Sequence, residues 1–359
     1  MNKKIRVGII GFGNIAKGAH LPGYMHSEDC EVTAICDSDD SRLAYAAQIC
    51  NLPKENCFKN YKDLITSDFV DVVDICTPNH MHYEVAQKAI QAGKPFSIEK
   101  PVAMNYKESL DLLERAQKTN IPTFVCFTWR YRQHIRFMKS VIDRNEIGEL
   151  YHIYIRCIKD SGLWLNRKLE WRFQKDKAGS GVLGDLGSHM FDIIRFFGQE
   201  FEGVYADSGI IVKQRQRIDS DEIDNVTTDD WSNIIAKLKN GVSATIALSR
   251  CATTISDLIE IELFGKNGAI KYTYFDGKQT IEICTGITDI SGKGRHTITP
   301  PESFVASQSQ CFIDLVKGKK DPYIATLEDG VKCQSVIDAA LKSIEERRYV
   351  EISEITEER

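Results

Sequence analysis

The stretch IRVGIIGFGNIA, residues 5–16, decides the fold of the first part of the chain. Its opening residues are mostly apolar and predict a buried β-strand, and the glycines after them predict a tight turn that leads into a helix. Gly11 would permit the turn, Gly13 would let a pyrophosphate approach the backbone, and Ala16 would let the helix pack closely on the strand. A strand, a glycine loop and a helix in this order are typical of a dinucleotide-binding site.

Residues around this loop indicate which dinucleotide would bind. Asn14 and Ile15 begin the helix, whose exposed N–H groups can hold phosphates. Asp37 follows a second apolar run, 21 residues past Ala16, where an acid can accept both hydroxyls of an adenine ribose, although it could also be an ordinary turn or cap residue. Its charge would repel a 2′-phosphate, so NAD is favoured over NADP. Arg42 nearby weakens that preference.

Up to about residue 127, short apolar runs alternate with longer amphipathic stretches. Near-continuous apolar runs separated by helices predict a parallel sheet that is covered by helices on both faces. The expected strands are residues 5–10, 32–36, 70–76, 96–98 and 123–127, and the clearest expected helices are residues 82–92 and 106–119.

Two further motifs follow expected strands. Thr77, Pro78 and Asn79 come after VDVVDIC, and Glu99 and Lys100 come after PFSI. Ligands bind outside the carboxyl ends of the strands in open α/β sheets, so both motifs are expected at the same edge as the glycine loop. A lysine in a turn is usually a surface residue. Lys100 is nevertheless a candidate site residue, because it ends a strand and the proline after it limits its direction.

After residue 150 the pattern indicates paired, antiparallel strands. Asn240 and Gly241 are a strong hairpin signal between two strand-like runs. The expected strands of this part are residues 231–239, 242–249, 258–264, 269–275 and 280–284. Residues 213–231 are polar and are expected to form an exposed excursion.

The length of 359 residues is too great for a single ordinary core and suggests two domains. Because the alternating strands and helices give way to antiparallel strands, we expect a dinucleotide-binding domain over residues 1–127 and a second domain, of the α+β class, over residues 128–359. Thr326 and Asp329 have the spacing of a capping box and predict a closing helix that runs to about Arg347.

The stretch DLGSHMFD, residues 185–192, combines core residues with ionisable ones. On a helix, Asp185 and His189 lie one turn apart on the same face, with Asp192 just beyond them, while the apolar residues between them would anchor the helix in the core. One interpretation is a capping Asp and a core His bonded to a backbone carbonyl. The other is an imidazole made more basic by carboxylates, which takes or gives a proton near neutral pH. Several glycines before His189 suggest that the backbone approaches another segment closely.

Aromatic and basic residues gather in two short stretches. Flat rings can cover the apolar face of a sugar while Arg donates to its hydroxyls, so these stretches are candidates for substrate binding, or equally for packing between domains. No metal site is expected, since His80 and His82 face apart on a helix and no third ligand is indicated. The aromatic and basic residues are Trp129, Arg130, Tyr131, Trp164, Trp171 and Arg172.

Composition and charge argue against several classes of function. The 46 basic and 51 acidic residues give a net charge of -5 without a basic tract, which argues against a nucleic-acid partner. No apolar run approaches the roughly 18 residues that a membrane helix needs, so no membrane is expected as a partner. The eleven cysteines are an odd number without a C-x-x-C pair, which favours a reducing cytoplasm and argues against a disulfide framework or a zinc site.

The motifs GFGNIA, CTPNHMH, IEKP and GVLGDLGSHMFD, in this order and spacing, resemble the Gfo/Idh/MocA family of glucose-fructose oxidoreductase and inositol dehydrogenase. The resemblance covers essentially the whole chain, and IEKP together with D-x-G-x-H is its specific part. It implies an α/β N-terminal Rossmann domain and an α+β C-terminal domain with a large, mainly antiparallel open sheet for substrate binding and oligomerisation. It also implies homodimers or homotetramers, often assembled through the outer face of that sheet.

The resemblance assigns roles to individual residues. Lys100 matches the catalytic lysine of the EKP motif, and Asp185 and His189 match the downstream catalytic pair. The residues expected on the cofactor side, besides the glycine loop and Asp37, are Thr77, Pro78, Asn79, His82 and Glu99. Those expected on the substrate side are Lys100, Asp185 and His189, together with Arg130, Trp171 and Arg172 from the aromatic and basic stretches.

The implied reaction is the reversible transfer of a hydride between nicotinamide and a secondary alcohol of a sugar, polyol or cyclitol. His189 would take the hydroxyl proton, Lys100 would hold the same oxygen and Asp185 would tune both, while the choice of His189 or Lys100 as proximal base stays open. An NAD-dependent glycosidase and a non-catalytic cofactor-binding regulator are the alternatives within this fold. Residues 130–133 read RYRQ where members of the family often read R-F-x-P, so the substrate entrance departs from the family pattern.

Overall fold

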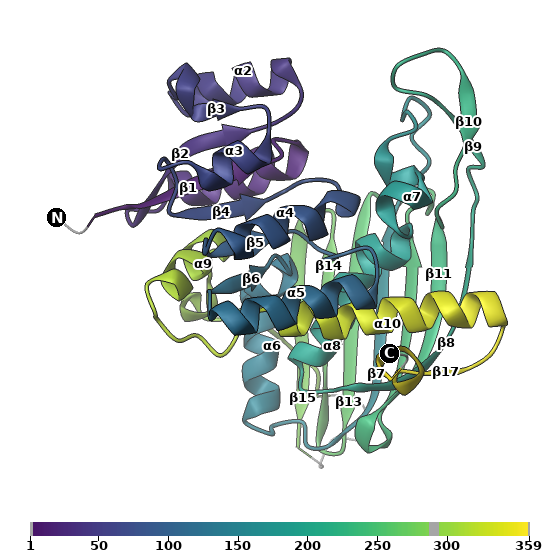
Figure 1. Cartoon of the computed structure of the whole chain (residues 1–359). Coiled ribbons are helices and arrows are strands. Elements are labelled where there is room, and N and C mark those ends of the chain that lie inside the picture. Colours follow the sequence, from purple (N-terminus) through teal and green to yellow (C-terminus); the bar gives the residue numbers. More distant parts are fainter. Residues whose placement is uncertain (1–2, 287–293, 358–359) are drawn as a thin grey trace. The chain divides into compact units, whose positions relative to one another are not determined.

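The computed structural model describes residues 3–286 and 294–357 (Figure 1). It divides the chain into two compact units, of which the first is Met1–Phe127 with Ala306–Lys332 and the second is Thr128–Val305 with Cys333–Arg359. The expectation that residues 128–359 form one domain therefore fails for Ala306–Lys332, which belongs to the first unit.

The first unit is built on a six-stranded sheet in the order β3-β2-β1-β4-β5-β6, and every described pairing in it is parallel. The predicted α/β class is confirmed. The strands are β1 (Ile5–Ile10), β2 (Cys30–Cys36), β3 (Cys57–Phe58), β4 (Val72–Ile75), β5 (Phe96–Ile98) and β6 (Thr123–Val125).

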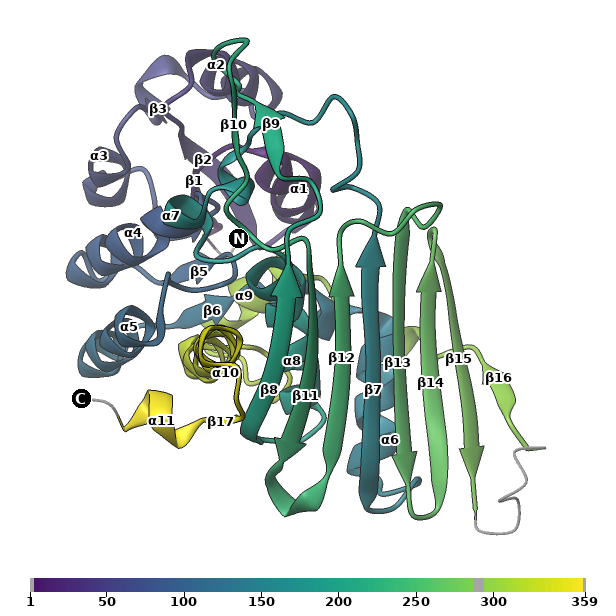
Figure 2. The ribbon, with the colours of Figure 1, turned by 90° about the vertical axis from the view of Figure 1, so that its right-hand side faces the viewer.

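Helices cover both faces of this sheet because its central strands are apolar on both sides, with Val7, Ile9 and Val73 all fully buried. In Figure 2, α3, α4 and α5 lie along one face, and α1 and α9 along the other. The helical segments are η1 (Ala16–His20), α1 (Leu21–Met25), α2 (Asp40–Ile49), η2 (Lys54–Asn56), α3 (Tyr61–Thr66), α4 (Asn79–Gln91), α5 (Tyr106–Thr119) and α9 (Gln308–Val316).

The segment Ala306–Lys332 joins the first unit through apolar and backbone contacts. Phe312 of α9 is fully buried, and its ring centroid lies 5.8 Å from that of Phe124 in β6. The N–H of Val125 donates to the carbonyl of Ala325 over 2.9 Å, which extends the edge of the sheet. Burial of α9 on the sheet thus brings the chain back to its first unit.

The second unit is built on a nine-stranded sheet in the order β16-β15-β14-β13-β7-β12-β11-β8-β17. Every described pairing is antiparallel except that of β7 with β12, so the predicted large, mainly antiparallel sheet is confirmed. The strands are β7 (Leu150–Lys159), β8 (Phe201–Gly209), β11 (Trp231–Leu238), β12 (Ser243–Ser249), β13 (Asp257–Gly265), β14 (Gly268–Phe275), β15 (Lys278–Thr285), β16 (His296–Ile298) and β17 (Val350–Glu351).

Local chemistry explains two features of this sheet. Asn240 and Gly241 have φ of 68° and 82°, the two positive values that a tight hairpin turn requires, and they join β11 to β12 as predicted. Along β7, Ile153, Ile155 and Cys157 are buried while the residues between them are exposed, so one face of the sheet packs against the core.

Helices of the second unit cover the apolar face, and α6 and α8 contact strands of the sheet directly (Figure 2). The expected polar excursion contains a small strand pair, β9 (Gln214–Gln216) with β10 (Ile223–Asn225). In the described residues, no helix is long and apolar enough to cross a bilayer. The remaining helices are η3 (Thr128–Tyr131), α6 (Gln133–Asp143), η4 (Trp171–Phe173), α7 (Lys175–Ala178), η5 (Leu183–Gly187), α8 (Ser188–Phe196), η6 (Lys239–Gly241), η8 (Glu302–Phe304), α10 (Leu327–Glu346) and α11 (Ser353–Thr356).

Candidate active site

The glycine loop turns at Gly11, as the sequence predicts. Gly11 has φ of 87°, a conformation that favours glycine, and its N–H donates to the carbonyl of Cys36 over 2.8 Å. A Cβ at this position would lie 2.8 Å from the carbonyl oxygen of Cys76, so β1 and β4 approach each other too closely for a larger residue. At Gly13, by contrast, a Cβ would meet nothing within 4 Å, which leaves room above the backbone for a ligand.

Polar groups near this loop fit a bound dinucleotide. Asn14 and Ile15 at the start of the helix are exposed, so the N–H groups of this turn can reach a phosphate. The hydroxyl of Thr77, just after β4, is buried and has no hydrogen-bond partner among the described residues. Buried hydroxyls normally have a partner, so this oxygen points to a ligand. The residues present therefore fit NAD.

Asp37 follows β2 directly and is 7% exposed. Its Oδ2 accepts a hydrogen bond from the N–H of Phe12 over 2.7 Å, and its Oδ1 accepts one from the N–H of Asp39 over 2.9 Å. Asp37 is thus a turn residue, while each of its oxygens keeps a second lone pair that a ribose hydroxyl can use. Arg42, on α2, is exposed and its Nε lies 3.9 Å from the carboxylate of Asp39.

Lys100 follows β5 and is partly exposed. Its N–H donates to Oε2 of Glu99 over 3.2 Å, and its peptide bond to Pro101 is cis. On the other side, the carbonyl of Pro101 lies 2.7 Å from Nδ1 of His82. The backbone of Lys100 is therefore held on both sides by buried ionisable residues.

His82 and Glu99, which are expected on the cofactor side, also brace this segment. Nε2 of the fully buried His82 lies 2.9 Å from the carbonyl of Thr77, so both of its ring nitrogens face backbone carbonyls. Burial lowers the pKa of His82, although the two carbonyls oppose this. Glu99 directs Oε1 to His20 and Oε2 to the N–H of Lys100. Both residues therefore make internal hydrogen bonds, and their contact with the cofactor stays a prediction.

In the second unit, the stretch from Gly181 to Met190 is buried except for Asp185 and His189, which are partly exposed. Asp185 lies in η5, a π-helical turn, and His189 lies in α8, which continues from it. Single π-turns inside helices often mark functional sites. The apolar residues anchor the helix as predicted, with Leu186, Met190 and Phe191 all buried.

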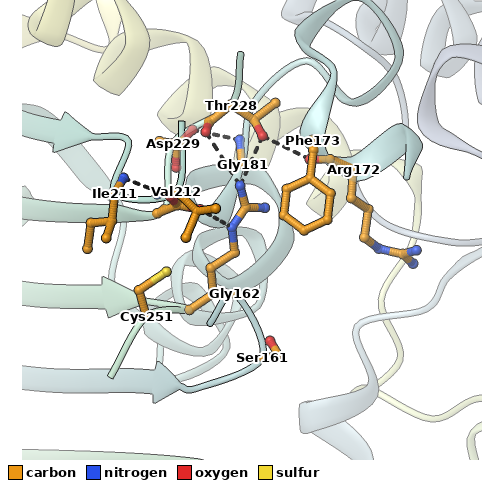
Figure 3. A network of polar contacts seen from close by, with 12 residues as sticks. Ser161, Gly162, Arg172, Phe173, Gly181, Ile211, Val212, Thr228, Asp229 and Cys251 are labelled. Atoms are coloured by element: carbon orange, nitrogen blue, oxygen red, sulfur yellow. Dashed lines mark hydrogen bonds and ion pairs between the residues drawn. The ribbon is translucent and has the colours of Figure 1, made fainter. Parts of the chain in front are cut away.

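Asp229 holds the start of this stretch (Figure 3). Its Oδ1 accepts from the N–H of Gly181 over 2.6 Å, and its Oδ2 accepts from the N–H of Leu183 over 2.9 Å. A Cβ at Gly181 would lie 1.9 Å from the carbonyl oxygen of Asp229, so only glycine fits. Burial raises the pKa of Asp229, and its backbone hydrogen bonds oppose this. The close approach predicted from the glycines is confirmed.

A buried ion pair fixes the loop that carries Arg172. Nε of Arg250 donates to Oδ1 of Asp230 over 2.7 Å, and a terminal nitrogen donates to the Thr228 hydroxyl over 3.0 Å. That hydroxyl in turn donates to the carbonyl of Arg172 over 2.9 Å, within the network of Figure 3. The backbone of Arg172 is thereby held, while its guanidinium lies 4.3 Å from the ring centroid of Trp171.

Arg130 and Asp192 pair with each other. Nε and a terminal nitrogen of Arg130 donate to the two carboxylate oxygens of Asp192 over 2.7 and 2.6 Å, and the side chains are only 5% and 1% exposed. The guanidinium of Arg130, which was expected to contact substrate, is thus turned to a buried carboxylate.

The two aromatic stretches lie in different surroundings. Trp129 packs edge-on against Tyr272 and Tyr274 of β14, with the Arg132 guanidinium 3.9 Å from its ring centroid. Trp164, in contrast, is 58% exposed. These contacts of Trp129 lie within the second unit, whereas the alternative to substrate binding was packing between domains. Trp171 and Arg172 are partly exposed.

Sequence reasoning missed the residues that support the site, namely Asp229, Asp230 and Arg250 in the second unit and His20 and Asp74 in the first. One signal was available, because Asp74 interrupts the apolar run VDVVDIC. A carboxylate in a strand that is buried on both faces must have a partner.

Comparisons with known proteins agree with these observations. A family model described as an oxidoreductase family with an NAD-binding Rossmann fold matches residues 5–127, and one described as the GFO/IDH/MocA C-terminal domain matches residues 135–271.

Individual relatives match along most of the chain. Levoglucosan dehydrogenase of Pseudarthrobacter phenanthrenivorans is 28% identical over 315 residues, which cover 82% of this chain and 80% of that protein. Myo-inositol 2-dehydrogenase of Thermotoga maritima is 26% identical over 357 residues, covering 98% and 99%. The solved structure of levoglucosan dehydrogenase in complex with NADH has a TM-score of 0.88 and 25% identity, and the match covers 98% of this chain and 99% of that one.

Proposed function

Because the chain belongs to the Gfo/Idh/MocA family of NAD-binding oxidoreductases, we propose that it is a dehydrogenase that transfers a hydride between nicotinamide and a secondary alcohol of a sugar, polyol or cyclitol. One observation carries this proposal. Asp185 and His189 are the two partly exposed residues of a stretch that is otherwise buried. Ionisable side chains held in this way on an apolar helix are suited to proton transfer.

We assign three residues to the chemistry. His189 takes the proton of the substrate hydroxyl, Lys100 donates a hydrogen bond to the same oxygen, and Asp185 orients and polarises the imidazole. NAD, when bound, accepts the hydride from the carbinol carbon. The products are a ketone or lactone, NADH and a proton, so atoms and electrons balance. Whether Lys100 rather than His189 is the proximal base is decided by the variants described in the Discussion.

The first unit supplies the cofactor site in this proposal. The N–H groups near Gly13 and the start of the helix hold the pyrophosphate, and the carboxylate of Asp37 accepts from the adenine ribose. The unpartnered hydroxyl of Thr77 gives the cofactor a further hydrogen bond, and Pro78 and Asn79 lie in the same segment.

Replacing Asp37 by Ala is expected to reduce the preference for NAD over NADP by about tenfold or more, because the negative charge that repels a 2′-phosphate is lost. Asp37→Asn is the matched variant, since its amide oxygen can still accept from the N–H of Phe12, the bond that supports the glycine loop. Fluorescence titration with NADH and NADPH measures both affinities. If both variants keep the parent's ratio of NADH to NADPH affinity, Asp37 does not bind the ribose.

The substrate class follows from the relatives, and Trp171 and Arg172 of the second unit are proposed to contact the substrate. A panel of levoglucosan, myo-inositol, glucose 6-phosphate and other aldoses and glycosides tests this by the absorbance of reduced nicotinamide. A rise with one substrate identifies the dehydrogenase and its sugar class. Cofactor binding with release of a leaving group and no net NADH would instead indicate the glycosidase, and binding without any turnover would indicate a regulator.

A homodimer or homotetramer is proposed on the basis of the outer face of the large sheet. Tyr205, Ile235, Thr245 and Tyr154 stand opposite one another in register across β8, β11, β12 and β7. Tyr205, Ile235 and Tyr154 are 44%, 61% and 44% exposed, so an apolar row crosses this face. Exposed apolar rows of this kind are typical of surfaces that bind another protein chain.

Ile235→Glu is expected to convert the oligomer to monomers, because it places a charge in the middle of this row. Ile218→Glu is the matched control, since Ile218 is 67% exposed but lies beyond β9 in the polar excursion. Size-exclusion chromatography with light scattering gives the mass of each. A monomeric parent protein, or an Ile235→Glu variant that stays oligomeric, would contradict the proposed interface.

We further propose a cytoplasmic location. The support is that none of the eleven cysteines, all of which lie in the described residues, forms a disulfide bond, as expected in a reducing compartment.

A further inference from the structure

A second group of ionisable side chains lies in the first unit, next to Glu99. His20, from η1, is 2% exposed; its Nδ1 lies 2.8 Å from Oδ2 of Asp74, and its Nε2 lies 2.9 Å from Oε1 of Glu99. Asp74 comes from β4 and Glu99 follows β5. One buried imidazole thus ties the helix after the glycine loop to two strands of the sheet.

The hydrogen bonds define the charge of this group. Carboxylate oxygens accept hydrogen bonds, so an imidazole that bonds two of them donates from both nitrogens. It is therefore protonated and positively charged. Burial alone would lower the pKa of His20, but the neighbouring Asp74 carboxylate raises it well above its usual range. Burial alone would raise the pKa of Glu99, but the hydrogen bond from His20 and its positive charge bring this pKa below its ordinary value. Glu99 is therefore an anion at neutral pH.

Glu99 connects this group to Lys100. While Oε1 faces His20, Oε2 accepts the backbone N–H of Lys100 over 3.2 Å. At the far side, the second oxygen of Asp74 accepts from the hydroxyl of Ser97. Fully satisfied buried networks rigidify the backbone around them. We propose that His20 is a positioning residue for Lys100, which it holds in place through the carboxylate of Glu99.

A metal ion is the other chemistry that these residues could support. The ligand atoms of His20, Asp74 and Cys76 all lie within 4.8 Å of one another. Nδ1 of His20, however, already lies at hydrogen-bond distance from Asp74. Burial raises the pKa of Cys76 to about 12, which favours the thiol over the thiolate that binds metals. The observations therefore favour an ion-pair network.

The proposal rests on the proposed dehydrogenase function and is tested by a double-mutant cycle on the full chain. His20→Gln removes the positive charge and replaces one of the two donor nitrogens by an amide oxygen, which cannot donate. We expect kcat to fall about 100-fold, as for a misplaced catalytic group, while the Kd of NADH changes less than about threefold. If His20 acts through Lys100, the double variant His20→Gln/Lys100→Ala is no slower than Lys100→Ala alone. The proposal would be overturned if the losses in kcat of the two single variants multiply in the double variant. It would also be overturned if kcat of His20→Gln stays within threefold of the parent value.

Two controls separate positioning from loss of folding and from metal binding. Leu112→Ala removes a fully buried side chain of α5 and should lower thermal stability while kcat stays within about twofold. Asp74→Asn, which keeps the shape of the network but removes one charge, should lower kcat without unfolding the chain. Stoichiometric metal in the purified protein, lost in His20→Gln, would overturn the ion-pair network.

A last measurement does not depend on the substrate. If the parent turns over nothing in the panel, the proposed function fails, and the labelling rate of Lys100 by an amine-reactive reagent still tests the positioning of this residue. Mass spectrometry is expected to show a several-fold change at Lys100 in His20→Gln and none at Lys118, which is exposed on α5. Equal rates in the parent and the variant at both lysines would overturn the proposal independently of catalysis.

Discussion

Replacing His189 by Ala is expected to lower kcat by about 100- to 10,000-fold, the range that a positioned general base contributes. The loss should appear in kcat and in kcat/KM alike, because a general base accepts the proton in the transition state and not in the ground state. NADH affinity should change little, since the glycine loop and Asp37 belong to the first unit and His189 belongs to the second. Steady-state kinetics together with NADH fluorescence distinguish the two effects.

Matched variants show whether the loss is specific. His296→Ala removes an exposed histidine of β16 from the same unit and should leave kcat within about twofold. Lys100→Ala should also lower kcat strongly. Added imidazole is expected to restore part of the rate to His189→Ala and none to Lys100→Ala if His189 is the proximal base. Near-parental rates in both variants would show that the proton is transferred elsewhere.

Replacing Arg130 by Met is expected to lower the free energy of unfolding of the second unit by about 3–5 kcal/mol, because it leaves the buried carboxylate of Asp192 without its partner. Both side chains are nearly inaccessible, at 5% and 1% exposed, so water cannot replace the lost hydrogen bonds. Urea denaturation followed by tryptophan fluorescence measures the change. All four tryptophans lie between residues 129 and 231, so the signal reports on this unit.

The double variant Arg130→Met/Asp192→Leu provides the control for this prediction. Replacing both partners of a buried ion pair by apolar residues is often close to neutral, so most of the lost stability should return. The substrate KM should change little in either variant that folds. Unchanged stability in Arg130→Met together with a raised KM would instead restore Arg130 to the substrate site.

Much of the fold could be predicted because its signals are local. The strand Ile5–Ile10 and the hairpin at Asn240 and Gly241 depend on residues that are neighbours in sequence. β7 carries a local alternation of buried and exposed residues from Ile153 to Cys157, but its partners could not be predicted, because β12 and β13 are joined to it by long connections rather than short turns. The return of Ala306–Lys332 to the first unit is equally non-local, since Phe312 finds its place beside Phe124 only in the folded chain.

The candidate site also combines residues with a local sequence signal and residues whose partners lie far away in the sequence. The candidate residues Lys100, Asp185 and His189 could be predicted from motifs, because the spacing of a motif is read directly along the chain. The partners of the other polar residues could not be read in this way. Arg130 and Asp192 are 62 positions apart in the sequence, and an arginine that donates to a sugar has the same sequence signature as one that donates to a buried carboxylate. The network around His20 joins three separate elements and has no linear motif.

The most direct test of the central claim follows the hydride itself. NADH carrying deuterium at the transferable position is incubated with the parent protein and the oxidised form of each sugar or cyclitol in the panel, and the products are analysed by mass spectrometry. For one substrate class we expect an alcohol that is heavier by one deuterium at its carbinol carbon, with the yield largely lost in His189→Ala. Products without deuterium throughout the panel, with the label still in NADH, would contradict the account.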